Sequence, residues 1–249
     1  MSQQTKTTGV VLREVKTGES DRILTILTPE FGVISAAAKG SQRLKNKLFA
    51  ATGLFCYSEF VLFAGKTMYT VDEATPIEVF FGLRESVEGM SLAMYLAELM
   101  GTLAPEGEEA AVQLRLLLNS LALICRGKRD LRQIKVVCEL RALSQAGYMP
   151  DLVACADCGC YESGAFAFDL QQGTLLCADC AARRQKTLNL SCAGLAAMRH
   201  ILYSEDDKIF NFTLEDDALR QLSQLMTAYT VQQLDHPFRS LDFLQTVLS

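Results

Sequence analysis

Four cysteines in two CxxC pairs are the residues of this sequence whose types and spacing most clearly indicate chemistry. Cys155 and Cys158 form the first pair, Cys177 and Cys180 form the second, and eighteen residues separate the pairs. Two such pairs can place four thiolates around one metal ion in a closed tetrahedral site. A site with no open coordination position holds structure and carries out no reaction. The spacing therefore predicts a structural Zn²⁺ ion bound by these four cysteines.

Two alternatives to this assignment remain open at the level of sequence. Cys160 follows Cys158 by two residues and could replace it as a ligand, although its gap from Cys155 is less regular. The cysteines could also form disulfides or stay as buried thiols. We expect neither, because the start of the chain lacks the apolar run of a signal peptide and the cytoplasm is a reducing compartment.

Basic residues are concentrated in one window of an otherwise acidic chain. The net charge is −5, yet no carboxylate lies between Glu30 and Glu59, a span of 28 residues. Four cations fall within nine residues of that span: Lys39, Arg43, Lys45 and Lys47. Because phosphate binding depends on local cations, the window predicts contact with a nucleic-acid backbone. Nearby aromatic residues could stack on bases or fill a core, and we prefer the core: Phe31, Phe49, Phe55 and Tyr57.

Catalytic motifs are absent from the sequence. The chain holds two histidines, His200 and His236, and neither lies in a motif. Phosphate-cradling glycine loops, HExxH and GxSxG are also missing. We therefore expect a protein that is not an enzyme. A zinc-dependent enzyme is the least favoured function. No stretch approaches the roughly 18 uncharged apolar residues of a membrane span, so no membrane association is expected.

The elements that must position these residues change in type along the chain. Five runs rich in β-branched and aromatic residues precede residue 80, and they span 8–15, 22–27, 32–39, 54–63 and 67–79. A five-stranded OB-fold barrel fits this count, and a sandwich or an SH3-like barrel fits it almost as well. Helical periodicity follows in 91–103, 110–125 and 131–147, and it resumes after Lys186.

The metal module lies between these helical segments. Residues 164–177 read as two strands around a Gln171-Gln172-Gly173 turn, which is a zinc-ribbon-like arrangement. We predict an α+β protein with three parts: an OB-fold nucleic-acid-binding domain, a helical domain and an inserted zinc module. Their predicted ranges are 1–80 for the OB-fold, 81–150 with 187–249 for the helical domain, and 151–186 for the module.

Three segments together resemble the bacterial recombination mediator family RecO. They are GVVLREVKTGESDRILTILTPEFGVISAAAKGSQR, ELRALSQAGYMPDLVACADCG with the later CADC, and RSLDFL near the C-terminus. The resemblance spans nearly the whole chain. It implies an N-terminal OB-fold, a helical domain and a zinc module, in the order that periodicity and spacing indicate independently.

The resemblance also implies function. RecO-like proteins bind single- and double-stranded DNA, anneal complementary strands, and work with RecR to load RecA onto DNA coated by single-strand-binding protein. By position, Lys39, Arg43, Lys45 and Lys47 then belong to the DNA-binding surface, with Arg13 and Arg22 as weaker candidates. The resemblance further implies a cytoplasmic, nucleoid-associated protein.

A second basic run opens the predicted helix 131–147. Lys128, Arg132 and Lys135 share one face beside an apolar stripe, which could bind an acidic peptide with a hydrophobic end. The resemblance implies contact between the helical domain and the acidic C-terminal tail of single-strand-binding protein, and we predict that Arg129, Arg132 and Lys135 make it. An ordinary amphipathic helix explains the same pattern. The alternative function is a zinc-containing interaction adaptor with little DNA affinity of its own.

Overall fold

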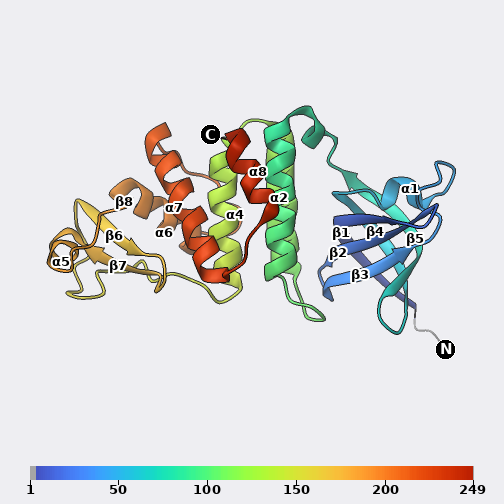
Figure 1. Cartoon of the computed structure of the whole chain (residues 1–249), viewed down its shortest axis with the longest axis horizontal. Helices are drawn as coiled ribbons and strands as arrows, with labels where there is room; N and C mark the ends of the chain where they lie inside the picture. The colour runs from blue at the N-terminus through green and yellow to red at the C-terminus, as the bar shows by residue number, and fades with distance from the viewer. Residues whose placement is uncertain (1–3, 249) are drawn as a thin grey trace. The chain divides into compact units, whose positions relative to one another are not determined.

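The computed structural model describes residues 4–248 and consists of two compact units (Figure 1). The first unit ends at Lys128 and the second begins at Arg129. This division lies inside the 81–150 segment that the sequence assigned to one helical domain. Within residues 4–248, no helix combines the length and the apolar character needed to cross a bilayer.

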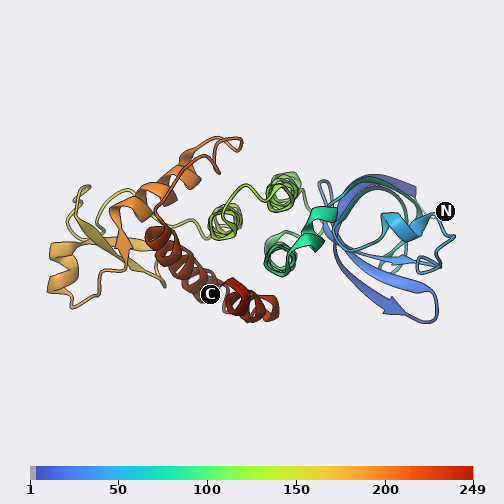
Figure 2. The same cartoon turned by 90° about the horizontal axis from the view of Figure 1, so that it is seen from above.

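Five strands of the first unit close into a barrel in the order β1-β2-β3-β5-β4 (Figure 2). Their bounds are β1 Gln4–Thr17, β2 Asp21–Thr28, β3 Gly32–Ala38, β4 Cys56–Ala64 and β5 Tyr69–Val79. Neighbouring strands run antiparallel except for β3 and β5, which are parallel. This is the OB-fold topology, so the predicted fold is confirmed and the sandwich and SH3-like alternatives are excluded.

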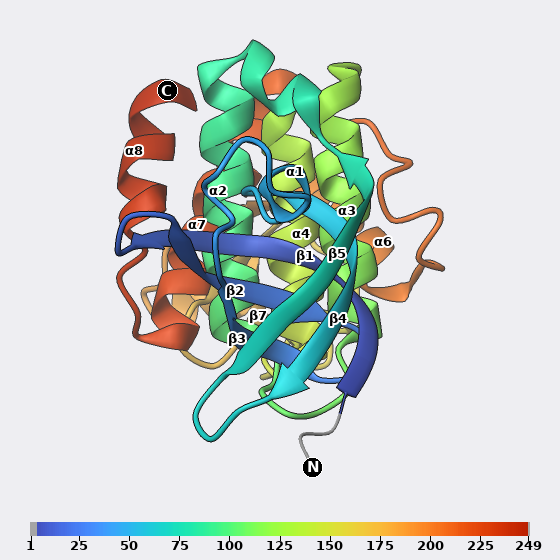
Figure 3. The same ribbon diagram turned by 90° about the vertical axis from the view of Figure 1, so that its right-hand side faces the viewer.

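Alternation along the strands explains the barrel. Leu24 and Ile26 on β2 and Phe60 and Leu62 on β4 are fully buried in one core cluster, and Thr25 between the first two is only partly buried. Gly9 is needed where β1 crosses β2, because a Cβ there would lie 2.6 Å from the side chain of Ile26. A short helix, α1 (Leu48–Ala51), lies at one end of the barrel and contacts β4 and β5 (Figure 3).

Two longer helices complete the first unit. They are α2 (Val87–Leu103) and α3 (Ala111–Arg126), preceded by the 3₁₀ turn η1 (Phe81–Glu85). The loop between them is tied to the β2–β3 turn, where the amide of Val33 donates to the carbonyl of Pro105 at 3.0 Å. Gly32 has φ +60°, and a Cβ there would lie 1.8 Å from the same carbonyl oxygen. Only glycine allows this approach, which fixes the helices against the barrel.

The second unit packs α4 (Leu131–Gln145) against α6 (Cys192–Tyr203) and α7 (Asp216–Leu234). The C-terminal helix α8 (Arg239–Leu248) follows α7. Between α4 and α6 the chain forms a sheet of order β7-β6-β8, with α5 between its second and third strands along the chain. Their bounds are β6 Ala165–Asp169, β7 Thr174–Cys177, α5 Ala178–Arg183 and β8 Leu190–Ser191. The cysteine hairpin is therefore an insertion between packed helices, as the sequence predicted.

Candidate metal centre and nucleic-acid interface

The four cysteines of the two CxxC pairs converge on one point. Their Sγ atoms all lie within 4.8 Å of one another, and those of Cys158 and Cys177 are 3.7 Å apart. Two thiolates bound tetrahedrally to zinc at about 2.3 Å would be about 3.8 Å apart, so this spacing fits a zinc-sized ion. The cluster could hold a metal ion, and Cys155, Cys158, Cys177 and Cys180 would be its four ligands.

Local structure explains how the thiols meet. After Cys155 the chain makes a tight turn, closed by the amide of Gly159 donating to the carbonyl of Cys155 at 2.9 Å. Gly159 has φ +69°, a conformation that glycine adopts without strain. The amide of Ala156 donates to the carbonyl of Leu175 at 2.8 Å and ties the turn to β7. Cys177 ends β7 and Cys180 lies one turn into α5, so both pairs face the same space.

The electrostatics of the cluster suit thiolates that share a cation. Burial raises the pKa of the Cys155 thiol, but backbone amides of Cys177, Cys158 and Asp157 outweigh it and lower that pKa to about 6. Burial and the neighbouring sulfurs raise the pKa of Cys180 to about 12. Four thiolates this close cannot all ionise without a positive charge between them, and a divalent ion supplies that charge.

Cys160 lies outside the cluster. Its Sγ donates to the carbonyl of Glu162 at 2.9 Å, and its own carbonyl accepts from the amide of Cys155 at 2.9 Å. The cysteine that could have replaced Cys158 thus stabilises the turn through its backbone. The structure places Cys158 with the other three sulfurs.

The segment that carries the predicted phosphate contacts is an ordered loop between β3 and α1, here called the basic loop (residues 39–47). The carboxylate of Asp21 accepts from the amide of Gly40 at 2.7 Å, and the amide of Gln42 donates to the carbonyl of Ser20 at 2.9 Å. Asn46 closes the base of the loop by donating to the carbonyl of Gly40 at 3.0 Å. Backbone groups and the side chains of Asp21 and Asn46 therefore hold the loop. None of these hydrogen bonds uses a cationic side chain of the loop.

Lys39, Arg43, Lys45 and Lys47 are all exposed. None of the four takes part in an ion pair among residues 4–248. Arg13 is also exposed and lies on the outer side of β1, opposite Thr25. These five side chains are available to phosphates.

The structure does not support Arg22 as a sixth contact. This side chain is 7% exposed, and it donates to the hydroxyl of Thr52 at 3.0 Å and the carbonyl of Phe49 at 3.3 Å. Its guanidinium also pairs with Glu14 at 3.2 Å and lies 5.2 Å from the centre of the Phe49 ring. Because Phe49 belongs to α1, Arg22 ties α1 to the barrel.

Sequence analysis missed the groups that hold the basic loop. Asp21 is the clearest case, because its carboxylate bonds to Gly40 nineteen positions further along the chain. The available signal was its position at the start of β2, directly after a turn.

The outer face of β1, β2 and β3 carries no aromatic side chain in its two exposed rows. Cross-strand pairing places Arg13, Thr25 and Ser35 in one row and Val15, Ile23 and Ala37 in the next. The aromatic residues near the basic window lie elsewhere: Phe55 is buried, Phe31 packs against the barrel core, and Phe49 lies against Arg22. The positions of Phe31 and Phe55 agree with the preferred interpretation of these rings as core residues, whereas Tyr57 on β4 is only half-buried.

The predicted partner contacts on α4 are occupied within the second unit. Lys135 is 3% exposed, and its Nζ donates to Glu139 at 2.8 Å and to Thr227 at 2.6 Å. Arg129 donates to the carbonyl of Phe210, and Arg132 pairs with aspartates. The apolar stripe beside them is core as well, since Ile134 and Cys138 are fully buried. The prediction that Arg129, Arg132 and Lys135 form a peptide-binding rim is therefore not supported.

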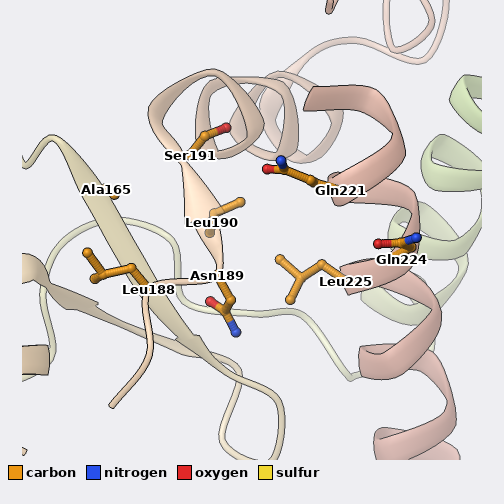
Figure 4. Close-up of a pocket in the computed structure, with 8 residues that line it drawn as sticks. All are labelled: Ala165, Leu188, Asn189, Leu190, Ser191, Gln221, Gln224 and Leu225. Carbon is orange, nitrogen blue, oxygen red and sulfur yellow. The ribbon is translucent and has the colours of Figure 1, made fainter. Parts of the chain in front are cut away.

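A groove of about 520 Å³ lies between the β8 segment and α7 (Figure 4). Its lining consists of Ala165, Leu188, Asn189, Leu190, Ser191, Gln221, Gln224 and Leu225. None of these side chains titrates near neutral pH, so the groove offers no acid, base or metal ligand.

The fold and the two sites define an OB-fold protein with an exposed cationic loop and a four-cysteine module. Its sequence matches the families described as "Recombination protein O N terminal" over residues 1–80 and "Recombination protein O C terminal" over residues 84–242. The chain therefore belongs to the recombination protein O (RecO) family. Membership supports a role in DNA repair and recombination.

Three curated relatives align over almost their full length, and each is named DNA repair protein RecO. The protein from Acetivibrio thermocellus is 36% identical over 242 residues, covering 97% of this chain and 96% of the relative. The protein from Alkaliphilus metalliredigens is 32% identical and covers 97% and 99%. The protein from Symbiobacterium thermophilum is 31% identical and covers 97% and 96%.

Proposed function

We propose that this protein is a non-enzymatic recombination mediator that binds single- and double-stranded DNA and anneals complementary strands. The observation that carries the proposal is the basic loop. Four exposed cations without ion-pair partners among the described residues extend from an anchored loop at one end of an OB-fold barrel. OB-folds bind oligonucleotides through the face of their second and third strands and through loops between strands.

The mechanism rests on phosphates rather than bases. Cations that neutralise the backbone weaken the repulsion between two strands, which favours pairing. The face formed by β1, β2 and β3 offers no ring on which a base can stack, so a strand held there keeps its bases available to a complement. Arg13 extends the cationic surface from the basic loop along β1.

Zinc is the proposed ion of the cysteine cluster. Cys155, Cys158, Cys177 and Cys180 would hold it, and four thiolates leave no position open for a substrate. The ion supplies positive charge that keeps the thiolates together, and its role is structural.

The partners belong to the same proposal. By family resemblance they are RecR, the C-terminal tail of single-strand-binding protein and, indirectly, RecA, in the cytoplasm near the nucleoid. No residue set for these protein contacts follows from α4, because its basic side chains are used internally.

The test is binding of the zinc-loaded protein to fluorescent single-stranded DNA across a salt series. The variant carries three changes: Lys39→Ala, Arg43→Ala and Lys45→Ala. We expect affinity to fall equally for all sequences and the slope of log K against log salt to flatten by about 2, because each lost phosphate contact on a single strand contributes roughly 0.7. The control is Arg84→Ala, which removes an exposed cation from η1, outside the strands and loops of the barrel.

An unchanged salt slope in the triple variant would show that the basic loop is not the phosphate-binding site. A wild-type protein that is folded and zinc-loaded but binds no DNA would favour the adaptor function, with a partner needed to complete the DNA site.

A further inference from the structure

We propose that Leu44 is an apolar wedge that unstacks one base step of the bound single strand. The inference rests on the proposed function, since it assigns a residue to the same DNA-binding site. Its side chain is 82% exposed, the highest value among the large hydrophobic residues of residues 4–248. Leu44 is also the one apolar residue of the basic loop.

The loop holds Leu44 away from the barrel. The amide of Arg43 donates to the carbonyl of Gly40 at 3.1 Å, and the amide of Asn46 donates to the carbonyl of Arg43 at 2.8 Å. These bonds close two successive turns, and Leu44 and Lys45 occupy the central positions of the second. These bonds fix the backbone on both sides of Leu44, which lies exposed at the corner of the turn.

Charge favours DNA as the group that covers this side chain. Arg43 and Lys45 flank Leu44, and both are exposed and without ion-pair partners in the described part of the chain. Phosphates held by these two cations would bring the intervening base step beside the leucine. Apolar side chains that enter a base step in this way unstack it in other DNA-binding proteins.

A single exposed leucine is ordinary on a protein surface. The role of Leu44 is inferred from its place between two exposed cations and beside a face without rings. The exposed rows on β1, β2 and β3 lack aromatic rings, so nothing on that face would take over a base that leaves its stack. The wedge would then present unstacked base edges directly to a complementary strand. Its effect should appear in base stacking and annealing rate rather than in affinity.

The experiment uses a single-stranded oligonucleotide containing 2-aminopurine, whose fluorescence rises when it unstacks. Binding of the wild-type protein is expected to raise the signal at saturation. Leu44→Ala should abolish this rise and slow annealing, while Kd changes by less than about tenfold and the salt slope is unchanged, because the cations remain. Leu44→Phe should restore the rise. The matched control is Ile77→Ala on β5, whose side chain is 55% exposed and outside the basic loop.

Failure of the wedge and failure of the proposed function give different results. Wild-type protein that binds no DNA overturns both. Saturated Leu44→Ala protein that gives the same fluorescence rise and annealing rate as the wild type overturns the wedge and leaves the phosphate site intact. The same result together with weakened binding of a protein partner would assign Leu44 to that partner.

Discussion

Tyr229 of α7 lies edge-on to Phe168 of β6, with ring centroids 5.1 Å apart and planes at 68°. The Tyr229 hydroxyl donates to the carbonyl of Tyr148 at 3.0 Å, so one side chain joins the helix, the strand and the segment that enters the metal module. Gly173 lies under the same hydroxyl, where a Cβ would be 2.8 Å from the oxygen. The cysteine hairpin is thus fixed to α7 through a buried ring.

Truncating Tyr229 should destabilise the second unit. Tyr229→Ala removes a fully buried ring, and comparable truncations cost about 3–5 kcal/mol. Tyr229→Phe keeps the ring contact with Phe168 and loses one hydrogen bond, so its cost should be about 1 kcal/mol. Urea unfolding followed by fluorescence or circular dichroism measures both. Equal effects of the two substitutions would mean that the ring packing contributes nothing.

Metal content should separate the clustered cysteines from their neighbours. Cys177→Ser should abolish stoichiometric zinc, because it removes one of four converging thiols. Cys160→Ser and Cys192→Ser are the matched controls, since both thiols donate to backbone carbonyls outside the cluster. The measurement is metal analysis of protein purified without chelator. Zinc lost from Cys160→Ser but kept in Cys177→Ser would reverse the ligand assignment.

Arg22 should act on stability. Arg22→Met leaves the carboxylate of Glu14 without its ion pair and the hydroxyl of Thr52 without its donor. We expect a loss of about 1–3 kcal/mol from the barrel unit. Arg13→Met is the control, because Arg13 is exposed on the adjacent strand, and it should weaken DNA binding while leaving stability within about 0.5 kcal/mol. Equal stabilities of Arg22→Met and Arg13→Met would show that the Arg22 contacts contribute no net free energy of folding.

Sequence patterns predicted the strands, the helices and the cysteine cluster because each depends on local spacing. Burial of individual charges depends on tertiary packing, which one sequence does not display. Arg22 and Arg13 look alike in sequence, yet one faces Thr52 and the other faces solvent. The period of α4 likewise left open whether Lys135 belongs to a solvent face, since its partner Thr227 lies 92 residues away.

Asp130 is the N-cap residue of α4, and its ionisation makes the stability of the second unit depend on pH. Side-chain hydrogen bonding from Arg132 lowers the pKa of Asp130, and burial opposes it. Because the folded pKa is depressed, this stabilisation is present above the unfolded value near 3.8 and is lost as pH falls through the folded pKa. Asp130→Asn should therefore cost a few tenths of a kcal/mol at neutral pH, since the pair is well solvated, and this cost should shrink as the pH falls through the folded pKa.

Unfolding in urea at several pH values measures this difference between wild type and variant. Asp207→Asn is the control, because Asp207 is exposed and makes no ion pair among residues 4–248. An Asp130→Asn deficit that stays constant from neutral to strongly acidic pH would mean that the charge is not its source.

Breaking the buried pair of Lys135 and Glu139 should destabilise the second unit about as much as Tyr229→Ala. Their side chains are 4% and 0% exposed, and the Nζ–carboxylate distance is 2.8 Å. Lys135→Met removes the positive charge that lies 2.8 Å from the buried carboxylate of Glu139, which should cost about 3–5 kcal/mol. The double variant Lys135→Met with Glu139→Leu should recover most of this loss, because the buried carboxylate is removed together with its lysine. Denaturant unfolding of the wild type, Lys135→Met, Glu139→Leu and the double variant gives the coupling energy between the two residues. A double variant no more stable than Lys135→Met would show that the loss does not come from burying the carboxylate without its lysine.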